Sequence, residues 1–377
     1  MTAEGAIEFE ALEALAASAM ELFGSAGYER VAPSFIQPAS LFLDRIGEEL
    51  RARTYVFTDP DGQELCLRPE MTIPVCRVFL ERDGEAPAAK FCYNGPAFRI
   101  QHKPDPLSPR EFRQAGIEHF GSAGRGADTE VLGLTVEAVR RSGVRSFTIK
   151  AGHLGLFTAL LDALEMPQRW RERLERSFWR PKAFARELAT LSRPHDGQPL
   201  PVPEDALTAD GLLAHLDAQG IAFLGRRSAA GIAKRLQDKA ADARETPLPQ
   251  ETVSLIENYL HVSGPVPAAL DVAEALLAKG GVSLGGAFAD ARALFADLQA
   301  AAGAVPIQFD AGFGRDFEYY TGMVFQIETA SAGHGGRIAG GGRYDRLIRA
   351  LSGGRRDVPA VGAALHTERL LAASRRR

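Results

Sequence analysis

The chain has 377 residues, of which 45% are hydrophobic, so it is long enough to form two or three domains with sizeable cores. A net charge of −4 and a pI near 6.1 argue against a protein that binds an extended stretch of nucleic-acid backbone. The three cysteines, Cys66, Cys76 and Cys92, form no CxxC pair, and no HExxH spacing occurs, which argues against a zinc site or a disulfide framework. Without a secretory leader or an apolar run of about 20 residues, the chain is expected to be cytoplasmic, with no membrane contact.

The first part of the chain combines helices with short strands. Apolar residues at helical spacing predict a helix over 6–26, followed by a short strand at 28–33 that ends in a proline. Two β-prone segments, 54–57 and 64–67, flank the turn sequence DPDG and predict a hairpin. The sequence LRPEMTIPVCRVF (67–79) then predicts a turn that leads into a helix.

Glu70 and Thr72 lie at this turn, outside regular structure. Helix capping is the default interpretation of such a pair in isolation. Thr72 would then accept a backbone N–H, and Glu70 would complement the positive end of the helix dipole. A ligand site is the alternative.

A strand with polar side chains on one face follows. Residues 89–101 contain two short apolar stretches around the sequence NGP, and FRQAGIEHFG (112–121) predicts a strand on which Gln114, Gly116 and Glu118 share one face. Because a strand rises about 3.3 Å per residue, Gln114 and Glu118 stand roughly 13 Å apart, with space over the glycine for a flat group. Since glycine weakens the packing of a structural strand, we favour a ligand floor over a solvated strand face.

The middle of the chain has a different character. After a predicted helix at 128–142 and a strand at 146–151, residues 155–265 carry both tryptophans, many Arg and Glu, and helical periodicity. We interpret 155–265 as an inserted, mostly helical domain. Its arginine run is interpreted as a solvated helix face; the run comprises Arg169, Arg171, Arg173, Arg176 and Arg180. Helices at about 267–279 and 284–302 lead back to strands.

Two predicted strands, 305–313 and 323–328, are expected to form a hairpin, because both alternate with the period of a half-buried strand. Between them lie a cation, a carboxylate and two phenols, on Arg315, Glu318, Tyr319 and Tyr320. This combination suits a small zwitterionic ligand. A surface hairpin whose Tyr and Arg side chains stack on each other is an alternative of about equal weight.

The predicted elements together give an α+β layout, in which an antiparallel sheet is flanked by helices and carries one helical insertion. Residues 1–154 and 266–377 are expected to form the core in two parts, separated by the inserted domain 155–265. The segment 358–373 predicts a final strand that runs into a helix.

Six segments together resemble the catalytic domain of histidyl-tRNA synthetases, a class II aminoacyl-tRNA synthetase fold, over roughly residues 10–150 and 280–373: LRPEMT, PAFR, FRQAGIEHFG, GRDFEYYTGMVFQ, IAGGGRYD and TERL. Each segment alone is moderately specific, and six in the right order are strong. The resemblance implies an antiparallel sheet and a homodimer formed through residues 10–33.

The resemblance also implies a histidine-binding pocket. Glu70 and Thr72 would face the amino end of the ligand, Gln114 and Arg315 its carboxylate and backbone groups, and Glu118 and Tyr320 the imidazole. Tyr319 would be an adjacent wall residue, and Arg99 would also belong to the histidine-binding residues. The chemistry is consistent, since a carboxylate and a phenol can hold a ring N–H and a ring nitrogen, while Arg meets a carboxylate through a charge-assisted bond.

The nucleotide side departs from the synthetase pattern. Gln101 replaces the glutamate that usually follows the second motif, and the loop at 105–109 lacks the usual Gly-Arg. The glycine-rich strand that normally lies close to adenine reads Ala363-Ala364-Leu365-His366, although Arg99 and Arg369 are retained. A synthetase is also expected to continue for about a domain's length, roughly 100 residues, to form an anticodon-binding domain, and we expect no such domain in this protein.

A synthetase-like core with a retained histidine pocket and altered nucleotide motifs resembles the family of histidyl-tRNA-synthetase-like regulatory subunits of ATP phosphoribosyltransferase. This enzyme catalyses the first step of histidine biosynthesis. That resemblance implies a non-catalytic subunit with no catalytic residues, cofactor or metal. The implied partner is the short-form catalytic subunit, with which the chain would form a hetero-oligomer. Free histidine would be the feedback effector that inhibits this complex. The subunit itself would be a homodimer, with no nucleic-acid partner.

Three alternatives stay open. The first is a compact ligase that still forms histidyl-adenylate and passes histidine to an acceptor other than tRNA. The second is a module that senses uncharged tRNA, against which the acidic pI counts. The third is a scaffold whose pocket is an evolutionary remnant.

Overall fold

A computed structural model describes residues 6–43, 51–82, 87–101, 109–194, 202–223, 228–314, 318–330 and 336–375. By contact the chain divides into two compact units. Unit 1 combines Met1–Ala163 with Glu257–Arg377, and unit 2 is Leu164–Ile256. Helix α6 (Leu154–Ala163), which the sequence analysis placed in the insertion, therefore belongs to unit 1.

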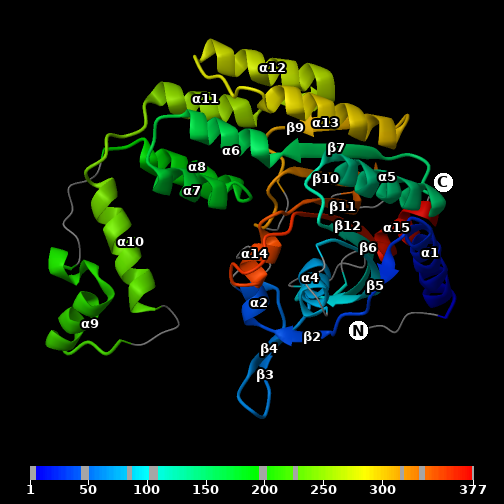
Figure 1. Cartoon of the computed structure of the whole chain (residues 1–377), viewed down its shortest axis with the longest axis horizontal. Coiled ribbons are helices and arrows are strands. Elements are labelled where there is room, and N and C mark those ends of the chain that lie inside the picture. The colour runs from blue at the N-terminus through cyan, green and yellow to red at the C-terminus, as the bar shows by residue number, and fades with distance from the viewer. Residues whose placement is uncertain are drawn as a thin grey trace. The chain divides into compact units, whose positions relative to one another are not determined.

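Unit 1 is built on a nine-stranded sheet (Figure 1). Its strands follow the order β1 (Glu29–Arg30), β5 (Ala89–Phe98), β6 (Glu111–Phe120), β12 (Ala360–His366), β11 (Arg337–Arg343), β10 (Met323–Glu328), β7 (Thr148–His153), β9 (Ile307–Asp310) and β8 (Ser263–Pro265). Neighbouring strands are antiparallel except for the pairs β1–β5 and β7–β9, which are parallel. The predicted α+β fold with an antiparallel sheet is confirmed.

A second, three-stranded sheet has the order β2 (Ile36–Pro38), β4 (Glu64–Leu67) and β3 (Val56–Thr58). Strands β3 and β4 form the predicted hairpin, which projects from the rest of unit 1 in Figure 1. The carboxylate of Asp59 accepts the backbone N–H groups of Asp61 and Gln63, so the aspartate of the DPDG sequence fixes the turn.

Helices lie on both faces of the large sheet. In the part of unit 1 that the structure describes, the helices include α1 (Ala6–Ser25), α2 (Ser40–Leu43), α4 (Thr72–Glu81), α5 (Arg125–Arg141), α6, α12 (Val266–Lys279), α13 (Ala287–Ala302), α14 (Leu347–Leu351) and α15 (Thr367–Arg375). Successive side chains of β6 point to opposite faces: Glu118 meets the first residue of α4, whereas His119 faces Glu130 of α5. Across the described residues, no helix has the length and apolar content needed to cross a membrane.

Strand β5 is one continuous strand, whereas the sequence predicted two short stretches separated by the NGP sequence. The proline is tolerated because its backbone faces away from β6. The carbonyl of Pro96 accepts a hydrogen bond from Nε of Arg68 at 2.7 Å, and the N–H of Phe98, two residues on, points to the Arg68 carbonyl at 3.0 Å. Proline therefore removes no bond from the β5–β6 ladder.

The expected hairpin between β9 and β10 is wrong, because β7 lies between these two strands. Both flanking strands have the predicted alternation, but the chain leaves β9 and crosses the end of β7 before it enters β10. Gly152 of β7 allows this crossing, since a Cβ atom there would lie 2.8 Å from the carbonyl oxygen of Phe313. The segment that carries Glu318, Tyr319 and Tyr320 is thus a crossover connection.

Unit 2 is helical, with α7 (Gln168–Ser177), α8 (Pro181–Leu191), the short 3₁₀ helix η1 (Glu204–Leu207), α9 (Ala209–Ala218) and α10 (Ala229–Asp242). Helix α11 (Gln250–Leu260) carries the chain back into unit 1. The interpretation of the whole arginine run as a solvated face is wrong. Arg169 and Arg173 both form ion pairs with Asp242 of α10, and Arg173 also pairs with Glu187 of α8. Their partners lie far along the chain, so local spacing does not reveal them.

Candidate functional site

The candidate site is centred on Glu118, a fully buried carboxylate on β6. Three hydroxyl groups donate to it. Thr72 and Tyr93 donate to Oε1 at 2.8 and 3.2 Å, and Tyr344 donates to Oε2. Burial raises the pKa of Glu118 to about 8, although the three hydrogen bonds favour the ionised form. Glu118 therefore changes charge near neutral pH.

Glu70 is a second buried carboxylate beside Glu118, and it caps helix α4. Its two oxygens accept the backbone N–H groups of Thr72 at 2.7 Å and Ile73 at 2.8 Å. Burial raises the pKa of Glu70, opposed by these backbone hydrogen bonds. The capping interpretation thus describes Glu70, whereas the Thr72 hydroxyl donates to Glu118 instead of accepting a backbone N–H.

Aromatic rings surround the two carboxylates. The rings of Tyr319 and Tyr320 lie 4.8 Å apart at 52°, and the Tyr319 ring meets that of Tyr344 edge-on at 5.6 Å. Burial is the main cause that raises the pKa of Tyr93, Tyr319 and Tyr344, so these phenols stay protonated and act as hydrogen-bond donors.

The space over Gly116 is filled by the chain itself, which corrects the expectation of an open ligand floor. A Cβ atom at Gly116 would lie 2.5 Å from the hydroxyl oxygen of Tyr93. The flat group that lies across the strand is therefore a phenol of the neighbouring strand β5. On the other side, a Cβ atom at Gly362 of β12 would collide with Oε2 of Glu118. The two glycines make room for the Tyr93 ring and the Glu118 carboxylate.

The remaining predicted pocket residues lie at the edges of this cluster. Gln114 is buried on β6, and its side-chain oxygen has no hydrogen-bond partner among the described residues. Arg99 is also buried and donates Nε to the carbonyl of Pro69 at 2.8 Å, next to Glu70 in the chain. Arg315 lies outside the described residues. The structure thus brings Glu70, Thr72 and Glu118 into one hydrogen-bonded group.

On the side expected to hold nucleotide in a synthetase, His366 of β12 stands opposite Gln114 of β6 and is buried. Arg369 donates to the carbonyl of Arg337 at 3.3 Å. Most of the loop with the missing Gly-Arg lies outside the described residues.

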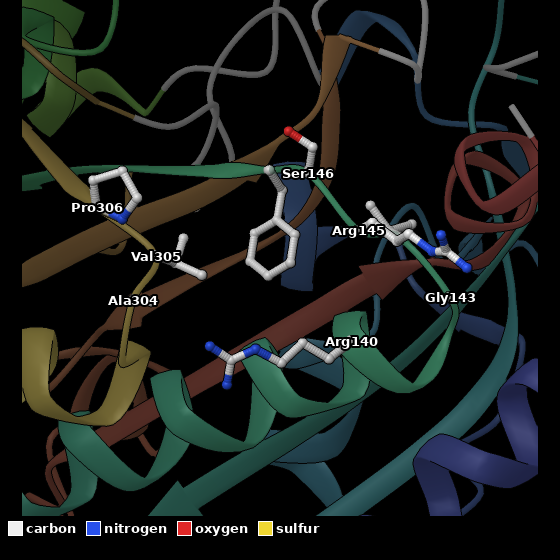
Figure 2. Close-up of a pocket in the computed structure, with 9 residues that line it drawn as sticks. Arg140, Gly143, Arg145, Ser146, Ala304, Val305 and Pro306 are labelled. Atoms are coloured by element: carbon white, nitrogen blue, oxygen red, sulfur yellow. The ribbon is translucent and has the colours of Figure 1, made fainter. Parts of the chain in front are cut away.

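A separate cavity of about 600 Å³ lies between the C-terminal end of α5 and the segment that precedes β9 (Figure 2). Its lining comprises Arg140, Gly143, Val144, Arg145, Ser146, Phe147, Ala304, Val305 and Pro306. Arg140 donates to the carbonyl of Ala302 at 2.8 Å and so ties the end of α5 to the end of α13. None of the predicted pocket residues lines this cavity. In the described part of the chain, no group of three or more His, Cys, Asp and Glu side chains could hold a metal ion.

Sequence reasoning missed two members of the site, Tyr93 and Tyr344. Tyr344 lies within the glycine-rich motif IAGGGRYD, two residues after three consecutive glycines, and this position was an available signal. Tyr93 gives no local signal, because its role depends on its register opposite Gly116.

Comparison with known proteins places this geometry in a family. A sequence profile described as Histidyl-tRNA synthetase matches residues 6–200 and 200–370. An ATP phosphoribosyltransferase regulatory subunit from Mesorhizobium japonicum is 35% identical over 369 residues, which cover 95% of this chain and 96% of that protein. The protein of the same name from Brucella anthropi is 35% identical over 353 residues, which cover 91% of this chain and 92% of that protein.

Solved structures agree in fold. The structure of an ATP phosphoribosyltransferase regulatory subunit/histidyl-tRNA synthetase from Bacillus halodurans superposes with a TM-score of 0.68 at 22% identity, covering 99% of this chain and 81% of that chain. A histidyl-tRNA synthetase from Nostoc gives a TM-score of 0.60 at 15% identity, covering 96% of this chain and 70% of that chain. The chain belongs to the family of histidyl-tRNA-synthetase-like ATP phosphoribosyltransferase regulatory subunits.

Proposed function

We propose that this chain is the regulatory subunit of ATP phosphoribosyltransferase and that free histidine binds at the Glu118 cluster as the feedback effector. The phosphoribosyltransferase activity would reside in a separate, short-form catalytic subunit. The observation that carries the proposal is a buried carboxylate held by three hydroxyls and flanked by phenol rings, in a chain that is 35% identical to named regulatory subunits.

The chemistry of the cluster suits histidine. A carboxylate that accepts a ring N–H in a buried site makes a strong, charge-assisted bond, and the neighbouring aromatic rings offer an apolar wall for the imidazole. Glu70 supplies a second negative charge for the ligand's ammonium group. Arg315 is proposed for the ligand's carboxylate and Gln114 for its backbone groups.

Signalling to the partner follows from linkage. Histidine can inhibit a distant catalytic subunit only if it binds two states of the assembly unequally, and coupling energies of about 1–3 kcal/mol are usual. We further propose a homodimer within the hetero-oligomer, and unit 2 as the inserted domain of the synthetase-like core.

The test is reconstitution. The chain is co-expressed with a short-form catalytic subunit, and the purified complex is assayed with and without histidine. The proposal expects co-purification, activity above that of the catalytic subunit alone, and inhibition by histidine. A chain that neither joins nor stimulates the catalytic subunit contradicts it.

A histidyl-adenylate-forming ligase is the second candidate, favoured by the retained Arg99 and Arg369. Against it, both arginines donate to backbone carbonyls of the chain itself, at Pro69 and Arg337. Histidine-dependent exchange between pyrophosphate and ATP separates the two functions.

A further inference from the structure

Tyr93 is a buried hydroxyl donor to Glu118, and the resemblance assigns it no role. It is 1% exposed, lies on β5 opposite Gly116 of β6, and donates to Oε1 of Glu118 at 3.2 Å. Its ring occupies the space that any side chain at position 116 would need. Both the position and the partner of this phenol are therefore set by the sheet.

The groups that face Glu118 come from every element packed against it. Strand β5 supplies Tyr93, helix α4 supplies the Thr72 hydroxyl and the Cys76 thiol, and the turn before α4 supplies Glu70. The other side chains are phenols, on Tyr319 and Tyr344. Within the described residues, no cationic side chain forms an ion pair with Glu118, so hydroxyl donors alone stabilise its charge there.

We propose that Tyr93 is a positioning residue for histidine recognition: by donating to Oε1 and filling the space over Gly116, it holds the Glu118 carboxylate ionised and aimed at the ligand's ring N–H. The identity of the ligand rests on the proposed function. The effect of the Tyr93 hydrogen bond on the ionisation of Glu118 is independent of that function.

The proton balance gives this role a measurable signature. Before binding, part of the Glu118 population carries a proton at neutral pH, because burial raises its pKa to about 8. On binding, the carboxyl O–H bond breaks, the proton passes to solvent, and the carboxylate accepts the imidazole N–H. Removing the Tyr93 hydroxyl removes one donor that favours the ionised form, so the protonated fraction grows and binding weakens most at the lower pH.

The first experiment needs no ligand. Infrared spectroscopy follows the C=O band of the protonated carboxyl group against pH, and the band is assigned by its loss in Glu118→Gln. Tyr93→Phe keeps the ring over Gly116 and should raise the midpoint. The matched control is Tyr259→Phe, since Tyr259 is buried and its hydroxyl has no hydrogen-bond partner among the described residues. This control should leave the midpoint unchanged.

An unchanged midpoint in Tyr93→Phe, or an equal shift in the control, overturns the assignment. Should Tyr93→Phe fail to fold, site-specific 3-fluorotyrosine at position 93 tests the same bond. It is a stronger donor of nearly the same shape, so it should lower the midpoint, and no shift would again overturn the proposal.

The second experiment measures L-histidine binding by calorimetry at about pH 7 and about pH 8.5. Tyr93→Phe should bind roughly tenfold more weakly at the lower pH, with a clearly smaller loss at the higher pH. Equal losses at both pH values would indicate a merely structural role and contradict the proposal. If the wild-type protein binds no histidine, the proposed function fails, and the infrared titration still decides whether Tyr93 controls Glu118.

Discussion

Tyr344 donates its phenolic hydrogen to Glu118, although the two residues lie 226 positions apart in the sequence. The bond joins the residue that directly follows β11 to the carboxylate of β6, with β12 between these strands. It is possible only because Gly362 of β12 leaves space for the carboxylate. The candidate site therefore requires strands from both halves of unit 1.

Replacing Glu118 with Gln should make the enzyme complex markedly less sensitive to histidine while sparing its basal activity. The amide keeps the size of the side chain, but a neutral acceptor replaces a charged one, and bonds to charged groups are worth about 1.5–3 kcal/mol. The measurement is inhibition of the reconstituted complex by histidine. Glu111→Gln, an exposed change on the same strand, is the matched control. Unchanged inhibition in Glu118→Gln would place the effector site elsewhere.

The contribution of Glu118 to the stability of the protein should fall as pH rises from about 4.5 to about 8. In this window the unfolded chain has already released the Glu118 proton, whereas the folded chain retains it, because burial raises the pKa from 4.5 to about 8. Glu118→Gln has no such proton, so the midpoint of thermal unfolding of the wild type should fall relative to that of the variant as pH rises over this window. Parallel pH profiles for the two proteins would show that Glu118 ionises normally in the fold.

The chain alone should form no histidyl-adenylate. The nucleotide side carries Gln101 and His366, and Arg99 and Arg369 donate to the chain's own carbonyls. Histidine-dependent exchange of labelled pyrophosphate into ATP should not exceed that of heat-inactivated protein. Robust exchange would instead support the ligase.

Asp242→Ala should destabilise unit 2 by about 1–3 kcal/mol, because it leaves the indole N–H of the buried Trp170 without its acceptor and removes one ion-pair partner each from Arg169 and Arg173. Asp242 accepts from Nε of Arg169 at 2.7 Å, from the indole N–H of Trp170 at 2.6 Å, and from Arg173. Denaturant unfolding followed by tryptophan fluorescence reports the change. Asp238→Ala on the same helix removes an exposed pair with Lys234 and should cost less than about 1 kcal/mol. If both variants lose the same free energy of unfolding, the Asp242 network stabilises unit 2 no more than an exposed ion pair does.

The protein should sediment as a dimer or larger assembly, above the 40.6 kDa of one chain. Several apolar residues of α1 pack inside unit 1, where Leu12, Ala16 and Phe23 are buried. Phe9 of the same helix stays 44% exposed. If the dimer forms through α1, Phe9→Asp should weaken it. Sedimentation of a stable monomer at micromolar concentration would contradict the homodimer.

Local sequence patterns predicted most elements but not their neighbours. Alternation found β9 and β10, and both termini of β10 agree with the predicted segment 323–328. The same alternation cannot show that β7 enters between them, because strand order depends on pairing between distant segments. The partners of Arg173 and the register of Tyr93 were missed for the same reason. Local patterns singled out most of the predicted site residues and the resemblance assigned them to one pocket, but their hydrogen bonds could be seen only in the fold.

The position of β7 between β9 and β10 has a consequence for how the protein is made. Both sheet neighbours of β7 follow unit 2 in the sequence, so β7 leaves the ribosome well before either partner exists. Domains generally fold as units during synthesis, and an unpaired strand is open to wrong partners until its own arrive. A chain cut off within unit 2 would leave both edges of β7 unpaired, so incomplete translation products should aggregate and be removed instead of persisting as a folded half.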